Sequence, residues 1–186
     1  LFRTRVLAVW LATAAALPVA LAASPSLIPQ PAKVQNLPGH FELAPGTPVR
    51  VSPGFEVPAK QLVEMLLPAT GWRLTIETRN AKDRPTDGIV FEKDAGAGGL
   101  GPEGYRLDVA AGQVTIHAET AAGAFYACQT IRQLLPLEIE SATPVSGACW
   151  LIPCVRIEDR PRFAWRGMML DSARHFQDKA FVLRTI

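Results

Sequence analysis

Between Val49 and Leu135 the apolar residues follow two spacings in turn, and this alternation restricts the possible fold more than any other feature. Two segments have the spacing of a helix packed on one side: Ala59, Leu62, Val63, Leu66 and Leu67, then Phe125, Cys128, Ile131, Leu134 and Leu135. Shorter segments have the alternation or the short apolar run of a β-strand: residues 49–51, 74–76, 88–91, 105–109 and 114–116. Because a sheet and a helix each bury an apolar face, the simplest arrangement places the helices on one face of a small, mostly antiparallel sheet. The pattern predicts an α+β domain over residues 49–140.

Turn-forming residues separate these segments. Pro58 suits the first turn of a helix, and Gly71 and Pro136 mark the ends of the two helices. The last two predicted strands flank residues 110–112 (AAG), which predicts a hairpin.

The regions on either side of this domain have a different character. Residues 23–48 are rich in proline and lack periodicity, which predicts an extended lead-in, and residues 141–160 are predicted to be a linker. The apolar run at residues 168–170 (MML) is typical of a strand buried on both faces, and Asp178 can cap a helix that begins at the next residue. A strand, a loop and part of a helix cannot enclose a core. Residues 161–186 are therefore predicted to start a further domain, and the chain to be a fragment.

The first residues have the pattern of an export signal. Arg3 and Arg5 precede an apolar run over residues 6–21, and residues 20–22 (ALA) form a small-residue cleavage site. The run is short for a bilayer span, which needs about 20 apolar residues. Residues 1–22 are therefore predicted to be a cleavable signal peptide, which implies a periplasmic or extracellular protein without a membrane segment after cleavage. An uncleaved membrane anchor is the alternative.

Charge and loop composition argue against two partner classes. The formal net charge is +2, and the basic residues are scattered rather than clustered, so nucleic acid is not an expected partner. The glycine-rich residues 94–104 lack the Gly-Lys-Ser/Thr ending of a phosphate loop and join two predicted strands, so no cofactor is expected.

Three cysteines do not make a disulfide framework. Cys128 lies on the apolar side of the second predicted helix and is expected to be buried. Cys149 and Cys154 could pair only if the chain between them bends, and this possibility stays open. No metal site is expected, because tetrahedral zinc needs four grouped ligands.

Two longer stretches carry a family resemblance. Residues 118–135 (AETAAGAFYACQTIRQLL) resemble the non-catalytic N-terminal α/β domain of glycoside hydrolase family 20. Residues 157–176 (IEDRPRFAWRGMMLDSARHF) resemble the place where the same family begins its catalytic (β/α)₈ TIM barrel, and residues 27–31 (LIPQP) resemble the usual opening of its first domain. The resemblance therefore implies a domain of hexosaminidase type followed by a truncated barrel.

The resemblance also implies a reaction and its substrates. Such enzymes remove terminal β-linked N-acetylhexosamine from oligosaccharides or glycoconjugates, and the substrate's own 2-acetamido oxygen attacks the anomeric carbon. A glutamic acid protonates the leaving oxygen, and a neighbouring aspartate orients the acetamido group. This Asp-Glu pair is expected beyond Ile186, so no catalytic residue is assigned here and the chain alone is expected to be inactive.

One residue of this chain is expected to contact the sugar. Arg174 matches the arginine of the family's Asp-x-x-Arg-His motif, just past the end of the first barrel strand, where barrel active sites form. A guanidinium can donate to two adjacent ring hydroxyls at once. Alternatively, Arg174 only pairs with Asp171 as a structural contact. Asp171 and His175 are expected to orient the loop without touching sugar, and Arg166 is expected to be structural.

Two other functions remain open at this point. The chain could be a non-catalytic carbohydrate-binding or structural module, or it could precede another kind of glycosidase barrel. His40 and His117 have no acidic partner nearby in sequence and are interpreted as ordinary surface or strand residues.

Overall fold

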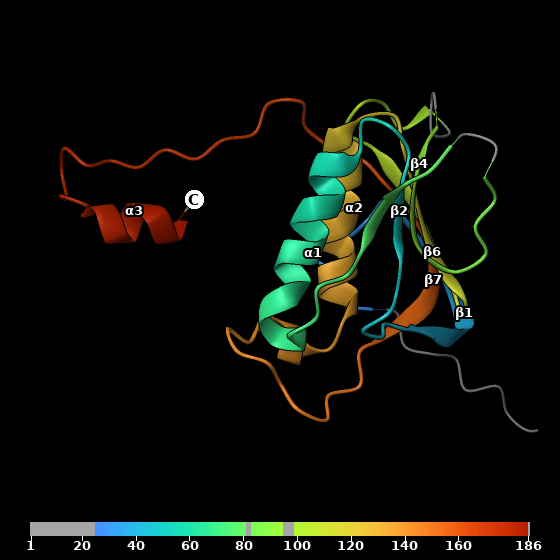
Figure 1. Cartoon of the computed structure of the whole chain (residues 1–186). Helices are drawn as coiled ribbons and strands as arrows, with labels where there is room; N and C mark the ends of the chain where they lie inside the picture. Colours follow the sequence, from blue (N-terminus) through green and yellow to red (C-terminus); the bar gives the residue numbers. More distant parts are fainter. Residues whose placement is uncertain (1–24, 81–82, 95–98, 186) are drawn as a thin grey trace, which may run out of the picture.

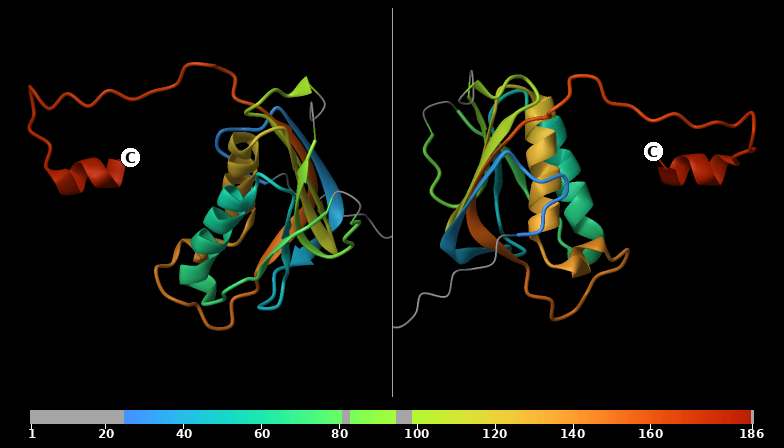
Figure 2. Two further views of the ribbon diagram at one scale, coloured as in Figure 1. Left: turned by 45° about the horizontal axis from the view of Figure 1, so that its top comes forward. Right: turned by 180° about the vertical axis from the view of Figure 1, so that it is seen from behind.

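A single seven-stranded sheet with two long helices forms the body of the molecule. The computed structural model describes residues 25–80, 83–94 and 99–185, so the predicted signal peptide at residues 1–22 lies outside the described residues. Helices α1 (Glu56–Thr70) and α2 (Ala121–Leu134) lie side by side on one face of the sheet (Figures 1 and 2). None of the described helices has the length and apolar character to cross a bilayer.

The sheet is half antiparallel and half parallel, in the order β1-β7-β5-β6-β4-β2-β3. The antiparallel side contains β1 (Lys33–Glu42), β7 (Leu151–Asp159), β5 (Tyr105–Ala110) and β6 (Gln113–Ala118), and the parallel side adds β4 (Gly88–Lys93), β2 (Val49–Val51) and β3 (Ile76–Thr78). A helical crossover returns the chain to the same end of the sheet, as α1 does between β2 and β3, and this makes neighbouring strands parallel. The α+β class with helices on one face is confirmed, whereas the sheet is mixed rather than mostly antiparallel.

Strands β1 and β7 lie in segments where the sequence predicted none. Strand β1 falls in the expected lead-in (23–48) and β7 in the expected linker (141–160), and β7 is an inner strand between β1 and β5. Their antiparallel register shifts between Asn36 and His40, and Pro153 pairs with His40. Proline cannot donate a ladder hydrogen bond, and a bulge accommodates such a break. Pro38 and Pro153 therefore lie within strands, whereas the other prolines of these two segments lie outside them.

Both predicted helices form, with ends fixed by local hydrogen bonds. Helix α1 ends at Gly71, which has a positive φ of 72° and donates its N–H to the Leu67 carbonyl at 2.8 Å. Helix α2 begins after Thr120, whose hydroxyl accepts the Ala122 N–H at 3.1 Å. A 3₁₀ turn, η2 (Leu137–Glu140), follows α2.

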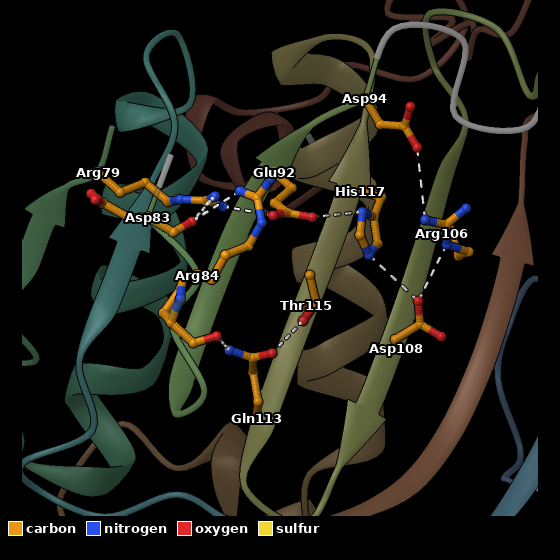
Figure 3. Close-up of polar contacts among 11 residues, drawn as sticks. Arg79, Asp83, Arg84, Glu92, Asp94, Arg106, Asp108, Gln113, Thr115 and His117 are labelled. Atoms are coloured by element: carbon orange, nitrogen blue, oxygen red, sulfur yellow. Dashed lines mark hydrogen bonds and ion pairs between the residues drawn. The ribbon is translucent and has the colours of Figure 1, made fainter. Parts of the chain in front are cut away.

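The predicted hairpin is confirmed and sets which side chains face the helices. Ala110 of β5 pairs with Gln113 of β6 across a two-residue turn. Tyr105 points toward the helices, where its hydroxyl lies 2.6 Å from the hydroxyl oxygen of Thr130 on α2. Asp108, three residues on, lies on the opposite, helix-free face (Figure 3). One face of the hairpin thus joins the core and the other carries charge.

The core lies between the helices and the sheet. The rings of Phe55 and Phe91 pack there with centroids 6.5 Å apart. Cys128 is buried as expected, and this burial raises the pKa of its thiol to about 12. Cys149 is exposed, Cys154 is buried and both are free thiols, so the bridge that the sequence left open is not formed.

Beyond β7 the chain leaves the domain as an extended segment and reaches the short helix α3 (Lys179–Thr185), which stands apart from the sheet (Figures 1 and 2). The predicted cap is confirmed, because Asp178 Oδ1 accepts the Phe181 N–H at 2.7 Å. The predicted strand at residues 168–170 is not formed. A strand needs a hydrogen-bonding neighbour, and the described part of the chain places none beside this segment.

Candidate functional site

An aspartate-centred turn holds the predicted sugar-binding arginine. Asp171 Oδ1 accepts the backbone N–H groups of Ala173 and Arg174, each at 3.1 Å. Its other oxygen, Oδ2, lies 3.3 Å from Arg174 Nε. Aspartate commonly fixes a turn by accepting from the backbone a few residues ahead. Asp171 therefore shapes the turn and also restrains the direction of the Arg174 side chain.

Arg174 retains donors for a ligand in this arrangement. The contact with Asp171 uses Nε, and the arginine side chain is 86% exposed. Among the described residues no protein group accepts from its two terminal nitrogens, which carry four N–H donors. His175 is exposed in the same turn. Pairing with Asp171 and binding of sugar are thus compatible, and the roles of Arg174, Asp171 and His175 stay predictions.

Arg166 connects the segment after β7 to the domain formed by the sheet and helices α1 and α2, which we call the small domain. It contacts Glu103 and Tyr126, and we call these three side chains the Arg166 clamp. Arg166 Nη2 lies 2.6 Å from Glu103 Oε1 and Nη1 lies 3.3 Å from Oε2, so the guanidinium meets the carboxylate with both terminal nitrogens. Nη2 also donates to the Tyr126 hydroxyl at 3.1 Å, and the Arg166 guanidinium carbon lies 5.9 Å from the Tyr126 ring centroid. The hydrogen bond from Arg166 holds the pKa of Glu103 below its ordinary value.

The loop that carries Glu103 is held against the start of α2 in two ways. The Thr120 hydroxyl donates to the Pro102 carbonyl at 2.5 Å. Gly123 of α2 approaches the Gly104 backbone so closely that a Cβ on Gly123 would lie 2.2 Å from the Gly104 oxygen. The close approach of two backbones at glycine places Glu103 beside Tyr126, one turn further along α2. No motif or spacing in the sequence marks Glu103 or Tyr126 as functional residues.

Replacing Gly123 with alanine is expected to lower the free energy of unfolding by about 1–3 kcal/mol, because the loop must move to admit the methyl group. At an unobstructed helix position the same change would stabilise by about 1 kcal/mol. Urea unfolding followed by circular dichroism measures the difference. Gly46→Ala is the control, since a Cβ there meets nothing within 4 Å. A stabilised Gly123→Ala variant would contradict the close approach.

A second polar cluster covers the helix-free face of the sheet (Figure 3). His117 lies between two carboxylates, with Nδ1 3.2 Å from Glu92 Oε2 and Nε2 3.5 Å from Asp108 Oδ2. Arg79 pairs with Glu92 at 2.9 Å, and Arg106 pairs with Asp108 at 3.2 Å. His117 is a strand residue as expected, but its acidic partners come from the neighbouring strands β4 and β5. Basic side chains from Arg79, His117 and Arg106 thus alternate with the carboxylates of Glu92 and Asp108, and this polar network joins neighbouring strands.

Asp108 gives the network a dependence on pH. Burial alone would raise the pKa of Asp108, but hydrogen bonds from His117 and Arg156 outweigh it and hold the pKa well below its usual range. A depressed pKa contributes stability above the unfolded value of about 4, and this stability is lost as the pH falls toward the folded value.

Asp108→Asn is therefore expected to cost about 1–2 kcal/mol of unfolding free energy at pH 7, and the difference from the unchanged chain should shrink below about pH 4. Urea midpoints measured between pH 7 and pH 2.5 test this. Asp87→Asn, which breaks an exposed pair with Arg50, is the control and should cost less than about 0.5 kcal/mol. A gap that stays constant down to pH 2.5 would contradict the role of the Asp108 carboxylate.

A cavity of about 790 Å³ lies where the small domain meets the segment after β7. It is lined by Pro29, Gln30, Pro31, Ala32, Tyr126, Asp159, Arg160, Pro161, Arg162, Phe163 and Arg166. Its one carboxylate, Asp159, accepts the Ala32 N–H at 3.1 Å. Glycoside hydrolysis by the usual scheme needs two carboxylates across the scissile bond, which this cavity does not supply. Within residues 25–80, 83–94 and 99–185, no group of three or more His, Cys, Asp or Glu residues could hold a metal ion.

Comparison with known proteins accounts for both parts of the chain. Residues 24–160 match the model of glycosyl hydrolase family 20, domain 2. The chain belongs to glycosyl hydrolase family 20. Residues 163–186 match the catalytic domain of the same family, so the Arg166 clamp joins the family's two domains and the Asp171–Arg174 turn lies in the catalytic one.

Several family 20 proteins resemble the chain over most of its length. It is 36% identical to a β-hexosaminidase of Porphyromonas gingivalis over 81% of this chain and 19% of that protein. It is 30% identical to a β-hexosaminidase of Vibrio furnissii over 91% of this chain and 25% of that protein. Among solved structures, the β-N-acetylhexosaminidase of Streptomyces coelicolor A3(2) superposes with a TM-score of 0.72 at 38% identity, over 88% of this chain and 33% of that one. The chain thus spans only 19% to 33% of the length of these relatives.

Proposed function

We propose that this chain is the N-terminal part of an exported β-N-acetylhexosaminidase, which hydrolyses terminal non-reducing N-acetyl-β-hexosamine residues of oligosaccharides or glycoconjugates. The observation that carries the proposal is the succession of two family 20 matches along one chain, with the second beginning three residues after the first ends. Relatives named β-hexosaminidase and N,N'-diacetylchitobiase support the substrate class.

The residues of this chain contribute binding rather than proton transfer in the proposed enzyme. Arg174 would donate its terminal N–H groups to sugar hydroxyls, while Asp171 holds the turn. The carboxylates that protonate the leaving oxygen and orient the acetamido group are expected on a later barrel strand. The barrel supplies the closed pocket in which such interactions gain strength.

A pair of substrates tests the proposal. The complete enzyme that contains this chain should release 4-nitrophenol from 4-nitrophenyl N-acetyl-β-D-glucosaminide but not from 4-nitrophenyl β-D-glucoside. The two sugars differ at the 2-position, and only the first carries the acetamido oxygen that the proposed reaction needs. The 186-residue chain alone should hydrolyse neither. Equal hydrolysis of both substrates by the complete enzyme would favour another class of barrel glycosidase.

Export is a separate part of the proposal and has its own test. The pattern at residues 1–22 supports a cleaved signal peptide. The mature protein recovered from the periplasm or the medium should begin near residue 23 by N-terminal sequencing. A membrane-bound protein that retains residues 1–22 would support the uncleaved anchor instead.

A further inference from the structure

We propose that Glu103 and Tyr126 are positioning residues for substrate binding: by holding Arg166, they fix the direction in which the first catalytic-domain segment leaves the small domain, and so the place of Arg174. The inference deepens the proposed function and rests on it. It assigns the small domain a role in the geometry of the sugar site, through contacts with Arg166 rather than through contact with sugar.

The geometry of the Arg166 clamp favours orientation over stability. The side chains of Arg166 and Glu103 are 39% and 37% exposed, and exposed ion pairs contribute little to stability. The contact nevertheless fixes the guanidinium in several directions at once. Two terminal nitrogens meet the carboxylate, and the Tyr126 hydroxyl accepts from Arg166 at 3.1 Å while it donates to Glu103 at 3.3 Å. A planar fork held by these two side chains, and also by the Phe163 carbonyl, leaves Arg166 little rotational freedom.

The support behind the clamp is equally restricted. Glu103 cannot move away from α2 freely, because Thr120 binds the adjacent Pro102 carbonyl and the Gly104 backbone abuts Gly123. Tyr126 is carried by the same helix, one turn after Gly123. Both partners of Arg166 are therefore anchored to one rigid element, which is what a positioning contact requires.

A short stretch of chain connects the Arg166 clamp to Arg174, the residue predicted to bind sugar. Asp171 follows Arg166 by five residues, which span about 16 Å when extended. Asp171 then fixes Arg174 through its backbone and side-chain contacts. A change of direction at Arg166 moves Arg174, and a misplacement of about 1 Å at a substrate-binding group can cost about 100-fold in rate.

A double-mutant cycle in the complete enzyme tests the proposal. Glu103→Gln should lower kcat/KM for 4-nitrophenyl N-acetyl-β-D-glucosaminide by about 10-fold, with a melting temperature within about 4 °C of the unchanged enzyme. In an Arg174→Ala background, Glu103→Gln should have less than about a 2-fold further effect, because its action passes through Arg174. Tyr126→Phe keeps the ring and loses the hydroxyl, so its kcat/KM should lie between those of the unchanged enzyme and the Glu103→Gln variant. Glu140→Gln, which breaks the Arg132–Glu140 pair elsewhere on the small domain, should leave the kinetics unchanged.

Two results would overturn the positioning role: effects of Glu103→Gln and Arg174→Ala that simply multiply, or a Glu103→Gln enzyme that behaves like Glu140→Gln. A complete enzyme without hexosaminidase activity would refute the proposed function. The restraint of Arg166 by the clamp can then still be tested separately, by limited proteolysis of the 186-residue chain. Trypsin should cleave after Arg166 more slowly than after the exposed Arg174. Glu103→Gln should raise the ratio of the cleavage rate after Arg166 to the cleavage rate after Arg174 several-fold. An unchanged ratio would show that the clamp does not restrain Arg166.

Discussion

Replacing Arg174 with alanine in the complete family 20 enzyme is expected to lower kcat/KM for an N-acetyl-β-glucosaminide by about 100-fold or more. A hydrogen bond from a charged donor contributes about 1.5–3 kcal/mol, and a guanidinium that grips two hydroxyls makes two of them. Each loss of about 1.4 kcal/mol of transition-state binding lowers the rate tenfold. We expect both a higher KM and a lower kcat, since the proposed contact would both bind and orient the sugar ring.

Two further variants give this prediction its controls. Arg174→Lys keeps the charge but loses the planar fork, so its defect should be intermediate. Arg184→Ala removes an exposed arginine from helix α3, away from the Asp171 turn, and should leave the kinetics close to those of the unchanged enzyme. Steady-state kinetics that are the same for Arg174→Ala and Arg184→Ala would remove Arg174 from the sugar site.

The largest expected effect on stability is at Phe91 in strand β4. Its ring is fully buried and packs 6.5 Å from the ring of Phe55, so Phe91→Ala leaves a cavity between the sheet and α1. Such truncations cost about 3–5 kcal/mol, a large part of the 5–15 kcal/mol that usually separates folded from unfolded domains. Urea unfolding at pH 7 should show a markedly lower midpoint or no folded baseline.

Phe176→Ala is the matched control, because the same side chain is 87% exposed there. Its unfolding midpoint should stay within the small range expected for surface substitutions, about 0.5 kcal/mol. If both variants shifted the midpoint equally, the assignment of Phe91 to the core would be wrong.

The sequence predicted those parts of the fold whose signal is local. The spacing of Leu62 and Leu66, and of Ile131 and Leu134, indicates helices by itself, and a small turn between two alternating runs indicates the hairpin. These features need no knowledge of distant residues. They also sufficed to place the helices on one face of a sheet.

Strands β1 and β7 were missed because their signal is not local. They pair with each other across more than a hundred residues, and the proline-rich composition around β1 indicated an extended lead-in rather than a strand. The opposite error occurred at residues 168–170, where an apolar run predicted a strand. An apolar run indicates that a strand would be buried if it formed. The hydrogen bonds that define a strand, however, come from a neighbouring strand.

The candidate site was predictable only in part. Arg174 and Asp171 were found through a motif, and their contact follows from a spacing of three residues in a turn. The Arg166 clamp was not found, because Glu103, Tyr126 and Arg166 come from a loop, a helix and the next domain. For His117 a usable signal did exist: pairing Ala110 with Gln113 across the hairpin places Arg106 opposite His117, and thereby Asp108 nearby.

The most direct test of the account is a crystal structure of the complete enzyme with N-acetylglucosamine bound. In that structure the terminal nitrogens of Arg174 should lie about 2.7–3.2 Å from sugar hydroxyls, with Asp171 still bound to Arg174 Nε. A sugar bound in the catalytic domain with Arg174 directed away from it, in contact with protein groups only, would contradict the account.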